Sequence, residues 1–547
     1  MKKMKALYIS IWILGMGFLA SSCEDHLDAE PYSFTSPENF YQSATDAEIA
    51  LTGIYSILTG NAIQGIGNNS TYSRQLMIML NGATDEAVVR DGLNQANYSP
   101  WGNAGFTSQS IFVNESWFYF YAGINRANYL IDKLPEIPDD DFNGNRKVEV
   151  EAEAKLLRGF YHMMLSMMHG AVPVYDTSIQ DETMERKPIE EVYQRVIEDY
   201  TFAFDHLSDR AAVSSHVNKW TAAALLAKAH TYLGSAKKFG LSDFGYAPNS
   251  FDWVDENYQY QRALFYTQEL ISKSGYRLID NYDYLFRETT KSQQYEECLL
   301  TGEASSNPNL YVINMIVSAF IPQGDNPVAG GGYGWYRPLG ELWSKYTAED
   351  YRRNHNITGN LVSSQPTEDI EGVTYYVPRT LVNANNGFLS IGKYRMIDPA
   401  QKAGPAWSSF ISLPLLRYAD VLLLHAEALY FTGNEAAARS ALTTLRQRSV
   451  IEPATVADLN LAYYKSDFVE ELLEERSREL CFENWRRIDL ARFNKYDETI
   501  ASLSADAGYY NTIVPTLKQN WKSEKVWFPI PIQQIDVNAN LEQNPGY

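Results

Sequence analysis

The helical hairpin at residues 417–448 is the feature that most constrains the fold of this chain. Its apolar residues recur at helical spacing up to Phe431, and Gly433-Asn434 then supply a left-handed helix end and a tight turn before an alanine-rich helix. Ala426 and Ala438 flank this turn, where two antiparallel helices must approach closely. The pattern is typical of the tetratricopeptide unit of about 34 residues. Because one hairpin cannot bury its own apolar face, the sequence predicts further stacked hairpins.

Three more helix pairs precede this hairpin, and their boundaries are more degenerate. Between them and the hairpin, residues 280–415 lose the helical pattern and contain a short strand candidate at 298–301, a second at 310–314, and turns rich in glycine and aromatic residues. The predicted fold is therefore mainly α: a tetratricopeptide-like superhelix that supports a loop-rich region with short strands. The pairs are expected near residues 46 and 117, 150 and 190, 220 and 258, and 420 and 435.

The first residues carry a targeting signal. A basic start is followed by an apolar run from Ala6 to Leu19, and Ala20-Ser21-Ser22 then lead directly into Cys23. Small residues that run into a cysteine resemble a bacterial lipobox, which predicts cleavage before Cys23 and lipidation of that residue. The predicted division is a lipoprotein signal peptide at 1–22, an N-terminal region at 23–285 and a C-terminal region at 286–547.

Composition excludes several classes of partner. The formal charge is −21, and removal of residues 1–22, which contain three lysines and no acidic residue, makes it −24. Nucleic acid and anionic membrane surfaces are bound by basic patches, so neither is an expected partner, whereas neutral ligands suit the charge. After lipidation only Cys298 and Cys481 remain, without a Cys/His cluster. The sequence therefore predicts no disulfide framework, no metal site and no cofactor.

The acidic residues Glu475, Glu479 and Glu483 resemble a catalytic carboxylate set only superficially. Arginines are interleaved with them at 476, 478, 486 and 487, and a nearby guanidinium group lowers a carboxylate pKa, whereas a general acid needs a raised one. We interpret the cluster as a structural ion-pair network. His162 and His169, two helical turns apart among methionines, are expected to pack in the core. No catalytic residue is predicted.

The aromatic loops carry the functional hypothesis. A pyranose stacks its C–H faces on Trp or Tyr rings, and its hydroxyl groups need polar partners such as Asp, Asn or Arg. A polar loop of about 50 residues before the helix near 117 and a glycine-rich segment near 333 combine these residue types. The candidate ligand residues are Asp85, Arg90, Tyr98, Trp101 and Asn103 in the first loop, Tyr333, Trp335 and Tyr336 in the second, and Trp407 in a third.

Taken in order, the motifs of this chain resemble those of the SusD/RagB family, surface lipoproteins of Bacteroidetes glycan-uptake systems. They extend over essentially the whole chain. One departure is Asn484-Trp485, where the family more often has Gly followed by His or Arg, and we expect only a local change of packing there. The matching motifs include Cys23 with Leu27-Asp28, Thr84-Asp85-Glu86, residues 123–128, Arg417-Tyr418-Ala419-Asp420, residues 475–480, Pro529-Ile530-Pro531 and Asn544-Pro545-Gly546-Tyr547.

The resemblance implies a SusD-like fold without catalysis. It implies an oligosaccharide ligand held in a shallow surface site, a lipid anchor in the outer membrane at the cell surface, and a TonB-dependent (SusC-like) transporter as partner. Two alternatives stay open at the level of sequence. One is a surface glycoside hydrolase of helical architecture, and the other is a peptide-binding or scaffolding repeat lipoprotein that uses the superhelix groove.

Overall fold

The fold is seen in a computed structural model, which describes most of the chain from residue 40 onward. The predicted signal peptide and Cys23 lie outside the described residues. The described ranges are 40–59, 71–89, 97–179, 181–211, 213–287, 289–304, 334–358, 367–370, 373–376, 389–394, 411–504 and 513–547.

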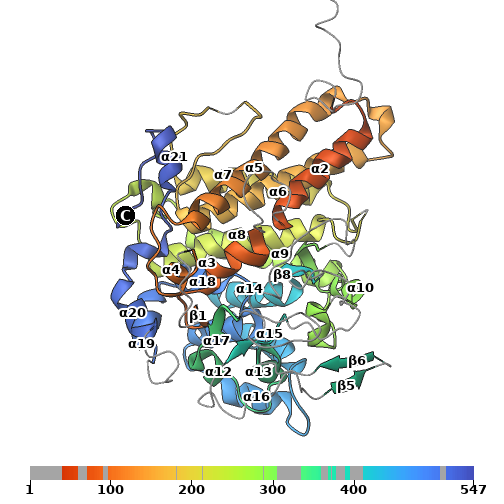
Figure 1. The fold of residues 1–547 in the computed structure, drawn as a ribbon. Coiled ribbons are helices and arrows are strands. Elements are labelled where there is room, and N and C mark those ends of the chain that lie inside the picture. The colour runs from red at the N-terminus through yellow and green to blue at the C-terminus, as the bar shows by residue number, and fades with distance from the viewer. Residues whose placement is uncertain are drawn as a thin grey trace, which may run out of the picture.

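Four helix pairs form the scaffold, as predicted. Within each pair the two helices pack along their length, and the second helix of one pair packs on the first helix of the next. Figure 1 shows the stack running from α2 and α5 down to α14 and α15. The pairs are α2 (Ala44–Thr59) with α5 (Ile111–Lys133), α6 (Arg146–His169) with α7 (Ile189–His206), α8 (Lys219–Phe239) with α9 (Glu256–Lys273), and α14 (Tyr418–Phe431) with α15 (Glu435–Gln447).

The hairpin formed by α14 and α15 has the predicted turn chemistry. Gly433 has a φ of +93°, a left-handed conformation that glycine adopts without steric cost. The Asn434 side chain accepts a hydrogen bond from the backbone N–H of Ala437 at 3.1 Å and so caps the start of α15. Ala426 and Ala438 are both fully buried. Their small side chains allow the close helix approach that the sequence predicted.

Shorter helices surround the scaffold. In Figure 1 α12, α13, α16 and α17 lie below the helical pairs, whereas α19, α20 and α21 lie along one side of the molecule. They are α3 (Met77–Asn81), α4 (Ser99–Gly102), α10 (Lys291–Gln294), α12 (Gly340–Ser344), α13 (Tyr351–Asn356), α16 (Val456–Tyr463), α17 (Phe468–Leu480), α18 (Arg486–Arg492), α19 (Tyr496–Ser502), α20 (Ile513–Asn520) and α21 (Ile532–Val537). A π-helix spans Thr71–Leu76, and 3₁₀ turns span Leu134–Glu136, Asp139–Asp141, Ala247–Asn249, Tyr282–Phe286 and Ser523–Val526.

The described strands form four two-stranded antiparallel ribbons and no larger sheet. The strand predicted at 298–301 is confirmed, and the candidate at 310–314 lies outside the described residues. The turn expected around Trp335 is corrected, because residues 336–338 pair with an N-terminal segment as a strand. The ribbons are β1 (Ala87–Val89) with β3 (Tyr336–Pro338), β2 (Cys298–Gly302) with β8 (Leu413–Arg417), β4 (Ile357–Thr358) with β7 (Ser390–Ile391), and β5 (Thr367–Ile370) with β6 (Val373–Tyr376).

The segment predicted as one long polar loop contains regular structure. Within residues 71–102 the chain forms the π-helix, α3, β1 and α4, and the side chains of α3 and β1 are buried throughout. The apolar run Met77-Ile78-Met79-Leu80 explains this difference, since it enters the core although only one turn of helix carries it. The candidate ligand residues of this segment therefore stand on a structured support.

The largest hydrophobic core cluster draws side chains from both the N-terminal and the C-terminal part of the chain. The C-terminal segment returns to the first half, where Phe528 N–H donates to the carbonyl of Met168 at 2.7 Å. The buried Asn544 side chain donates to the carbonyl of His169 at 2.9 Å. In the part of the chain that the structure describes, no helix combines the length and apolar character needed to cross a membrane.

Candidate functional site

The β1–β3 ribbon brings the two predicted aromatic loops together. Val89 pairs with Tyr336 in an antiparallel register, so the chain leaves β1 and enters β3 at the same end of the ribbon. Beside this end the rings of Tyr98 and Trp335 lie with their centroids 4.4 Å apart at an interplanar angle of 38°. Two segments that are far apart in the sequence therefore converge at one end of the ribbon.

Trp101 is a core residue, and its interpretation as an exposed sugar platform is corrected. Its side chain is 1% exposed. The indole stacks on Phe106 with centroids 4.8 Å apart and meets Phe528 edge-on at 5.3 Å. The ring also lies nearly parallel to that of Phe112 on α5, with centroids 6.4 Å apart, so it is surrounded by the loop after α4, by α5 and by the C-terminal segment. No face of this ring is open to a ligand.

The other described aromatic candidates also lie largely under the surface. Tyr98 is 2% exposed and Trp335 7% exposed, and Tyr98 also meets Phe112 of α5 edge-on at 5.4 Å. The hydroxyl group of Tyr336 donates to the carbonyl of Ile78 at 2.9 Å, which ties β3 to α3. These buried rings pack together beside the β1–β3 ribbon and hold it in position.

Asn103 and Asp85 have structural partners. The Asn103 side chain accepts a hydrogen bond from Gly105 N–H at 2.9 Å, and its main-chain carbonyl accepts one from Asn520 at 3.0 Å. Asp85 is buried and accepts two hydrogen bonds from Arg486, at 2.7 and 2.6 Å, and one from Lys345 at 2.6 Å. Burial disfavours ionisation of Asp85, but the two cations outweigh it and hold its pKa well below its usual range. Its assignment as a ligand contact is corrected to a buried ion pair.

Burial raises the pKa of the neighbouring Glu86 to about 7, although Arg486 acts in the opposite direction. A raised carboxyl pKa is a property of general acids, but Glu86 is 1% exposed. Its two oxygens accept from the Ser477 hydroxyl at 3.0 Å and from Phe482 N–H at 3.2 Å. The carboxyl group therefore joins α17 to the β1 segment and faces no cleft.

Four predicted residues lie outside the described residues: the candidate ligand contacts Arg90, Tyr333 and Trp407, and the lipidation site Cys23. In sequence Arg90 directly follows Val89, the last residue of β1, and Tyr333 comes three positions before Tyr336, the first residue of β3. Both residues are therefore close in sequence to described residues of the β1–β3 ribbon.

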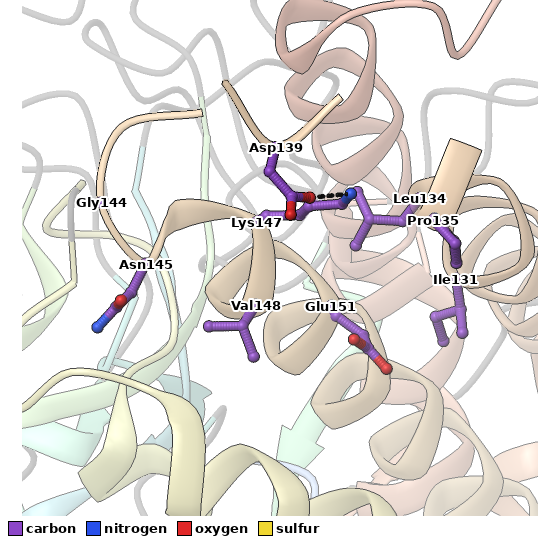
Figure 2. A pocket seen from close by; sticks show the side chains of 9 residues that line it. All are labelled: Ile131, Leu134, Pro135, Asp139, Gly144, Asn145, Lys147, Val148 and Glu151. Atoms are coloured by element: carbon purple, nitrogen blue, oxygen red, sulfur yellow. Dashed lines mark hydrogen bonds and ion pairs between the residues drawn. The ribbon is translucent and has the colours of Figure 1, made fainter. Parts of the chain in front are cut away.

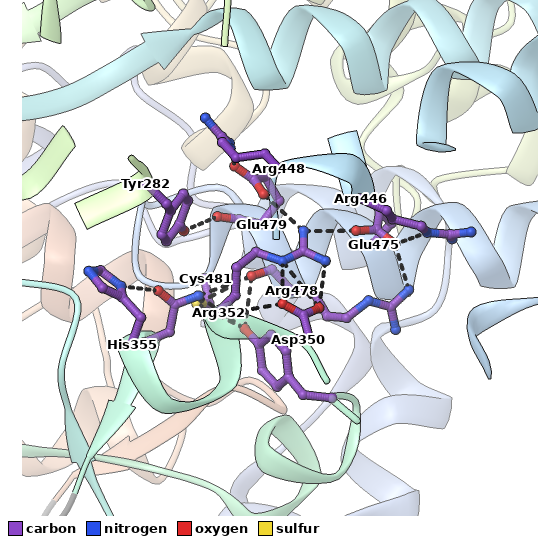
Figure 3. A network of polar contacts seen from close by, with 12 residues as sticks. Tyr282, Asp350, Arg352, His355, Arg446, Arg448, Glu475, Arg478, Glu479 and Cys481 are labelled. Atoms are coloured by element: carbon purple, nitrogen blue, oxygen red, sulfur yellow. Dashed lines mark hydrogen bonds and ion pairs between the residues drawn. The ribbon is translucent and has the colours of Figure 1, made fainter. Parts of the chain in front are cut away.

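The ion-pair network predicted for the last charged helix is confirmed (Figure 3). Arg352 lies within 2.8 Å of Glu475 and 2.9 Å of Glu479, and Arg417 lies within 2.6 Å of Glu479. All of these side chains are buried. Burial alone would raise the pKa values of Glu475 and Glu479, but the surrounding guanidinium groups hold both well below the usual range. Neither carboxyl group has the protonation state of a general acid.

The same network explains the Arg417-Tyr418-Ala419-Asp420 motif. Arg417 is the last residue of β8, directly before α14, and it pairs with Glu483 of the segment after α17 at 2.8 Å. Asp420, one turn later, pairs with Arg476 at 2.9 Å and with Lys228 of α8 at 2.7 Å. The Arg417–Asp420 motif and the charged residues of and after α17 therefore fix the positions of α14, α17 and α8 relative to one another.

The histidines behave as predicted. His162 and His169 are fully buried on α6, and burial lowers the pKa of each to about 3. Both are therefore neutral packing residues at neutral pH. Among the described residues no group of three or more His, Cys, Asp or Glu side chains has the arrangement of a metal site.

Two cavities on the described surface involve helix α5. The first, of about 530 Å³, lies between the end of α5 and the start of α6 (Figure 2). Its charged groups have partners, since Lys147 pairs with Asp139 at 2.5 Å and Glu151 pairs with Lys155 at 2.7 Å. It offers no exposed aromatic ring and no obvious ligand chemistry.

The second cavity, of about 560 Å³, is one that the sequence did not reveal as a site. Aromatic side chains of α5 and of the segment after α6 line it, together with Gln534 and Val537 of the C-terminal helix α21. A signal was present in Trp117-Phe118-Tyr119-Phe120-Tyr121, because five consecutive aromatic residues on a helix cannot all face one core. Phe118 is indeed 38% exposed, whereas Tyr119 and Phe120 are fully buried.

Comparison with known proteins places both halves of the chain in one family. Residues 344–547 match the profile described as "SusD family", and residues 25–233 match one described as "Starch-binding associating with outer membrane". The SusD-like protein P2 of Formosa agariphila is 25% identical over the full length of both chains.

Solved structures share the fold. A SusD homolog from Bacteroides thetaiotaomicron superposes with a TM-score of 0.71 at 20% identity, covering 93% of this chain and 98% of that one. Surface glycan-binding protein A from the same organism, solved in complex with laminarihexaose, has a TM-score of 0.66 at 19% identity and covers 92% of this chain and 99% of its own. Members of this group are carbohydrate-binding proteins and not enzymes. From its two profile matches, its full-length relative and its fold, the chain belongs to the SusD/RagB family.

Proposed function

We propose that this protein is a lipid-anchored glycan-binding protein of the outer cell surface, which captures oligosaccharide and passes it to a TonB-dependent (SusC-like) transporter. Family membership supports glycan binding, as does the laminarihexaose bound to a structural relative. The name of the N-terminal profile supports association with the outer membrane. The signal sequence that ends at Cys23 supports the lipid anchor.

The observation that carries this proposal is the convergence at the β1–β3 ribbon. Tyr98 and Trp335 pack against each other below the surface and hold both loop ends at one place. We infer that the sugar-contacting groups are supplied by the loops themselves, with Arg90 and Tyr333 as the primary candidates and Trp407 as a third. The buried rings would then determine where the loops stand, and the loop side chains would determine which glycan is bound.

A hydrolytic function has less support from the structure. Glu475 and Glu479 are buried and paired with arginines, so they offer neither an open cleft nor a raised pKa. The strongly negative chain favours neutral glycans over acidic ones. Laminarin and starch, the glycans named for relatives, are therefore the first ligands to test.

Affinity electrophoresis of the chain from Glu24 onward tests the proposal, with laminarin, starch and acidic polysaccharides cast separately in the gels. We expect one neutral glycan to retard the protein, and Arg90→Ala and Tyr333→Ala to weaken this binding by at least about fivefold, or roughly 1 kcal/mol. The control is Tyr258→Ala, which removes a half-exposed tyrosine of α9.

Absence of retardation by every glycan would contradict the binding function. Retardation that both loop variants leave intact would contradict the proposed site. Transfer to a transporter is tested separately: an outer-membrane TonB-dependent protein should copurify with the lipidated chain, and copurification should fail for Cys23→Ala, which abolishes the anchor.

A further inference from the structure

The cavity between α5 and α21 has the features of a second ligand site. Trp117, Phe118 and Tyr121 of α5 line it, and Tyr175 of the segment after α6 meets Tyr121 edge-on, with ring centroids 5.6 Å apart at an angle of 83°. Phe118 keeps 38% of its surface exposed, so part of its ring is available at the mouth. These rings come from two separate segments and together make a concave aromatic surface.

The aromatic wall is held rigidly. The Tyr121 hydroxyl donates to the carbonyl of Pro173 at 2.8 Å, which ties α5 to the segment after α6. On the other side, Gln534 of α21 donates to Asn114 of α5 at 3.2 Å. Asn538 donates to the carbonyl of Met184 at 2.9 Å and closes the third side. The cavity is therefore preformed, which reduces the entropic cost of ligand binding.

The lining specifies the class of ligand. Its polar side chains are the amides of Asn125, Gln534 and Asn538 and the carboxylate of Glu182, and none of its side chains is Lys, Arg or His. Without a cation, the site does not suit phosphate, sulfate or a uronic acid. Amides and a carboxylate beside aromatic rings instead suit the hydroxyl groups and C–H faces of a neutral sugar. A volume of about 560 Å³ lies within the range of small-ligand pockets.

We propose that this cavity is an accessory site for neutral saccharide, distinct from the site at the β1–β3 ribbon. Both sites involve α5: Phe112 contacts Tyr98 at the ribbon, and Phe118 lies six residues farther along, about 9 Å by helix rise. The inference rests on the proposed glycan-binding function. Two sites on one molecule allow a long polysaccharide to be held at two points, which raises its apparent affinity without new contacts at either site.

The test compares a polymer with a short oligosaccharide of the same glycan in Phe118→Ala and Tyr175→Ala. We expect both variants to lose at least about tenfold in affinity for the polymer, with less than about twofold change for a hexasaccharide that occupies the ribbon site. Phe265→Ala is the matched control, because Phe265 is a phenylalanine of α9 with a similar exposure of 42%. This control should bind both ligands like the unmodified protein.

Hydrogen exchange locates the contacts. Protection of peptides from residues 115–126 and 173–184 by the polymer, lost in Phe118→Ala, would support the accessory site. Polymer binding by both variants equal to that of the control, with protection only near residues 97–106 and 334–345, would overturn the inference and leave the proposed function intact. Protection of the cavity peptides by a copurified transporter without glycan would overturn it in favour of a polypeptide occupant. Absence of any glycan binding by the unmodified protein would overturn the proposed function and the accessory site together.

Discussion

Trp101 and Trp335 show how little the residue type alone says about a binding role. Both are flanked by polar and glycine residues in the sequence, a pattern that favours an exposed platform for sugar. In the structure Trp101 stacks within an aromatic cluster and Trp335 covers Tyr98. These two tryptophans therefore influence ligand binding by holding the loops in position. Substituting either of them changes the stability of the fold before it changes any contact with a ligand.

We predict that Trp101→Ala lowers the free energy of unfolding by about 3–5 kcal/mol, because it leaves a cavity beside Phe106 and Phe528. Trp101→Phe should lose much less, since a ring still fills part of the site. Urea unfolding followed by circular dichroism measures both changes. A Trp101→Ala protein with unchanged stability but abolished glycan retardation would restore the exposed-platform interpretation.

At position 484 this chain has Asn where the family more often has Gly, and the backbone conformation explains why Asn is tolerated there. The φ of Asn484 is +71°, in the left-handed region where glycine is favoured and asparagine is tolerated better than most residues. The side chain also accepts a hydrogen bond from the Asn81 amide at 2.9 Å. The expectation of a purely local change is consistent with this geometry.

At the scale of elements, close approach between helices decides which glycines are needed. A Cβ atom on Gly123 of α5 would lie 2.5 Å from the ring of Tyr161 on α6 and 3.2 Å from Ile57 on α2. Tyr161 cannot move away easily, because its hydroxyl donates to the carbonyl of Ile54 at 2.7 Å. Gly123 is therefore the contact point of three scaffold helices.

Gly53 on α2 is the matched control for Gly123, since a Cβ there would meet no atom within 4 Å. We predict that Gly53→Ala stabilises the protein by about 0.5–1 kcal/mol through helix propensity. Gly123→Ala has the same propensity gain, but overpacking should make it a net destabilisation of about 1–3 kcal/mol. Thermal unfolding of the two variants gives the comparison. Equal and positive shifts in Tm would show that the three helices adjust at no cost.

At the scale of the whole molecule, the C-terminal segment closes the fold onto its first half. His169 at the end of α6 is central to this closure: its ring nitrogen Nδ1 lies 3.0 Å from the carbonyl oxygen of Pro529. The carbonyl of His169 accepts from Asn544, and Arg186 donates to the Asn544 side chain at 2.6 Å. The Asn544-Pro545-Gly546-Tyr547 motif therefore has a structural role, because Asn544 holds the C-terminal segment against the end of α6.

This closure makes stability depend on pH. The folded pKa of His169 is about 3, below its ordinary value of 6.5, so the unfolded chain takes up a proton first as the pH falls. The contribution of His169 is fully present above about pH 6.5 and is lost between about pH 6.5 and pH 3. We predict that His169→Gln, which keeps a donor for Pro529, reduces the slope of unfolding free energy between pH 6 and pH 5 by about 1 kcal/mol per pH unit. Parallel slopes in urea titrations of the two proteins would contradict this.

The sequence by itself determined the helical pairs, the α14–α15 turn and the role of the buried charges. The helical features depend on short-range physics: apolar periodicity, the conformation of Gly433 and the cap at Asn434. The interleaved arginines indicated an ion-pair role, and Arg478 does pair with Glu475, but the partners of Glu479, among them Arg352 and Arg417, come from distant segments that only the tertiary structure brings together. Periodicity and capping act within a few turns of one helix, so they can be recognised without knowledge of the rest of the chain.

Only the tertiary structure decided which aromatic residues are covered and which are open. The burial of Trp101 requires Phe528 from the other end of the chain, and the stacking of Tyr98 requires Trp335. The accessory cavity likewise needs α5 and α21 to meet. Surface exposure is the result of all long-range contacts together, and a local pattern contains no information about the segment that will cover it.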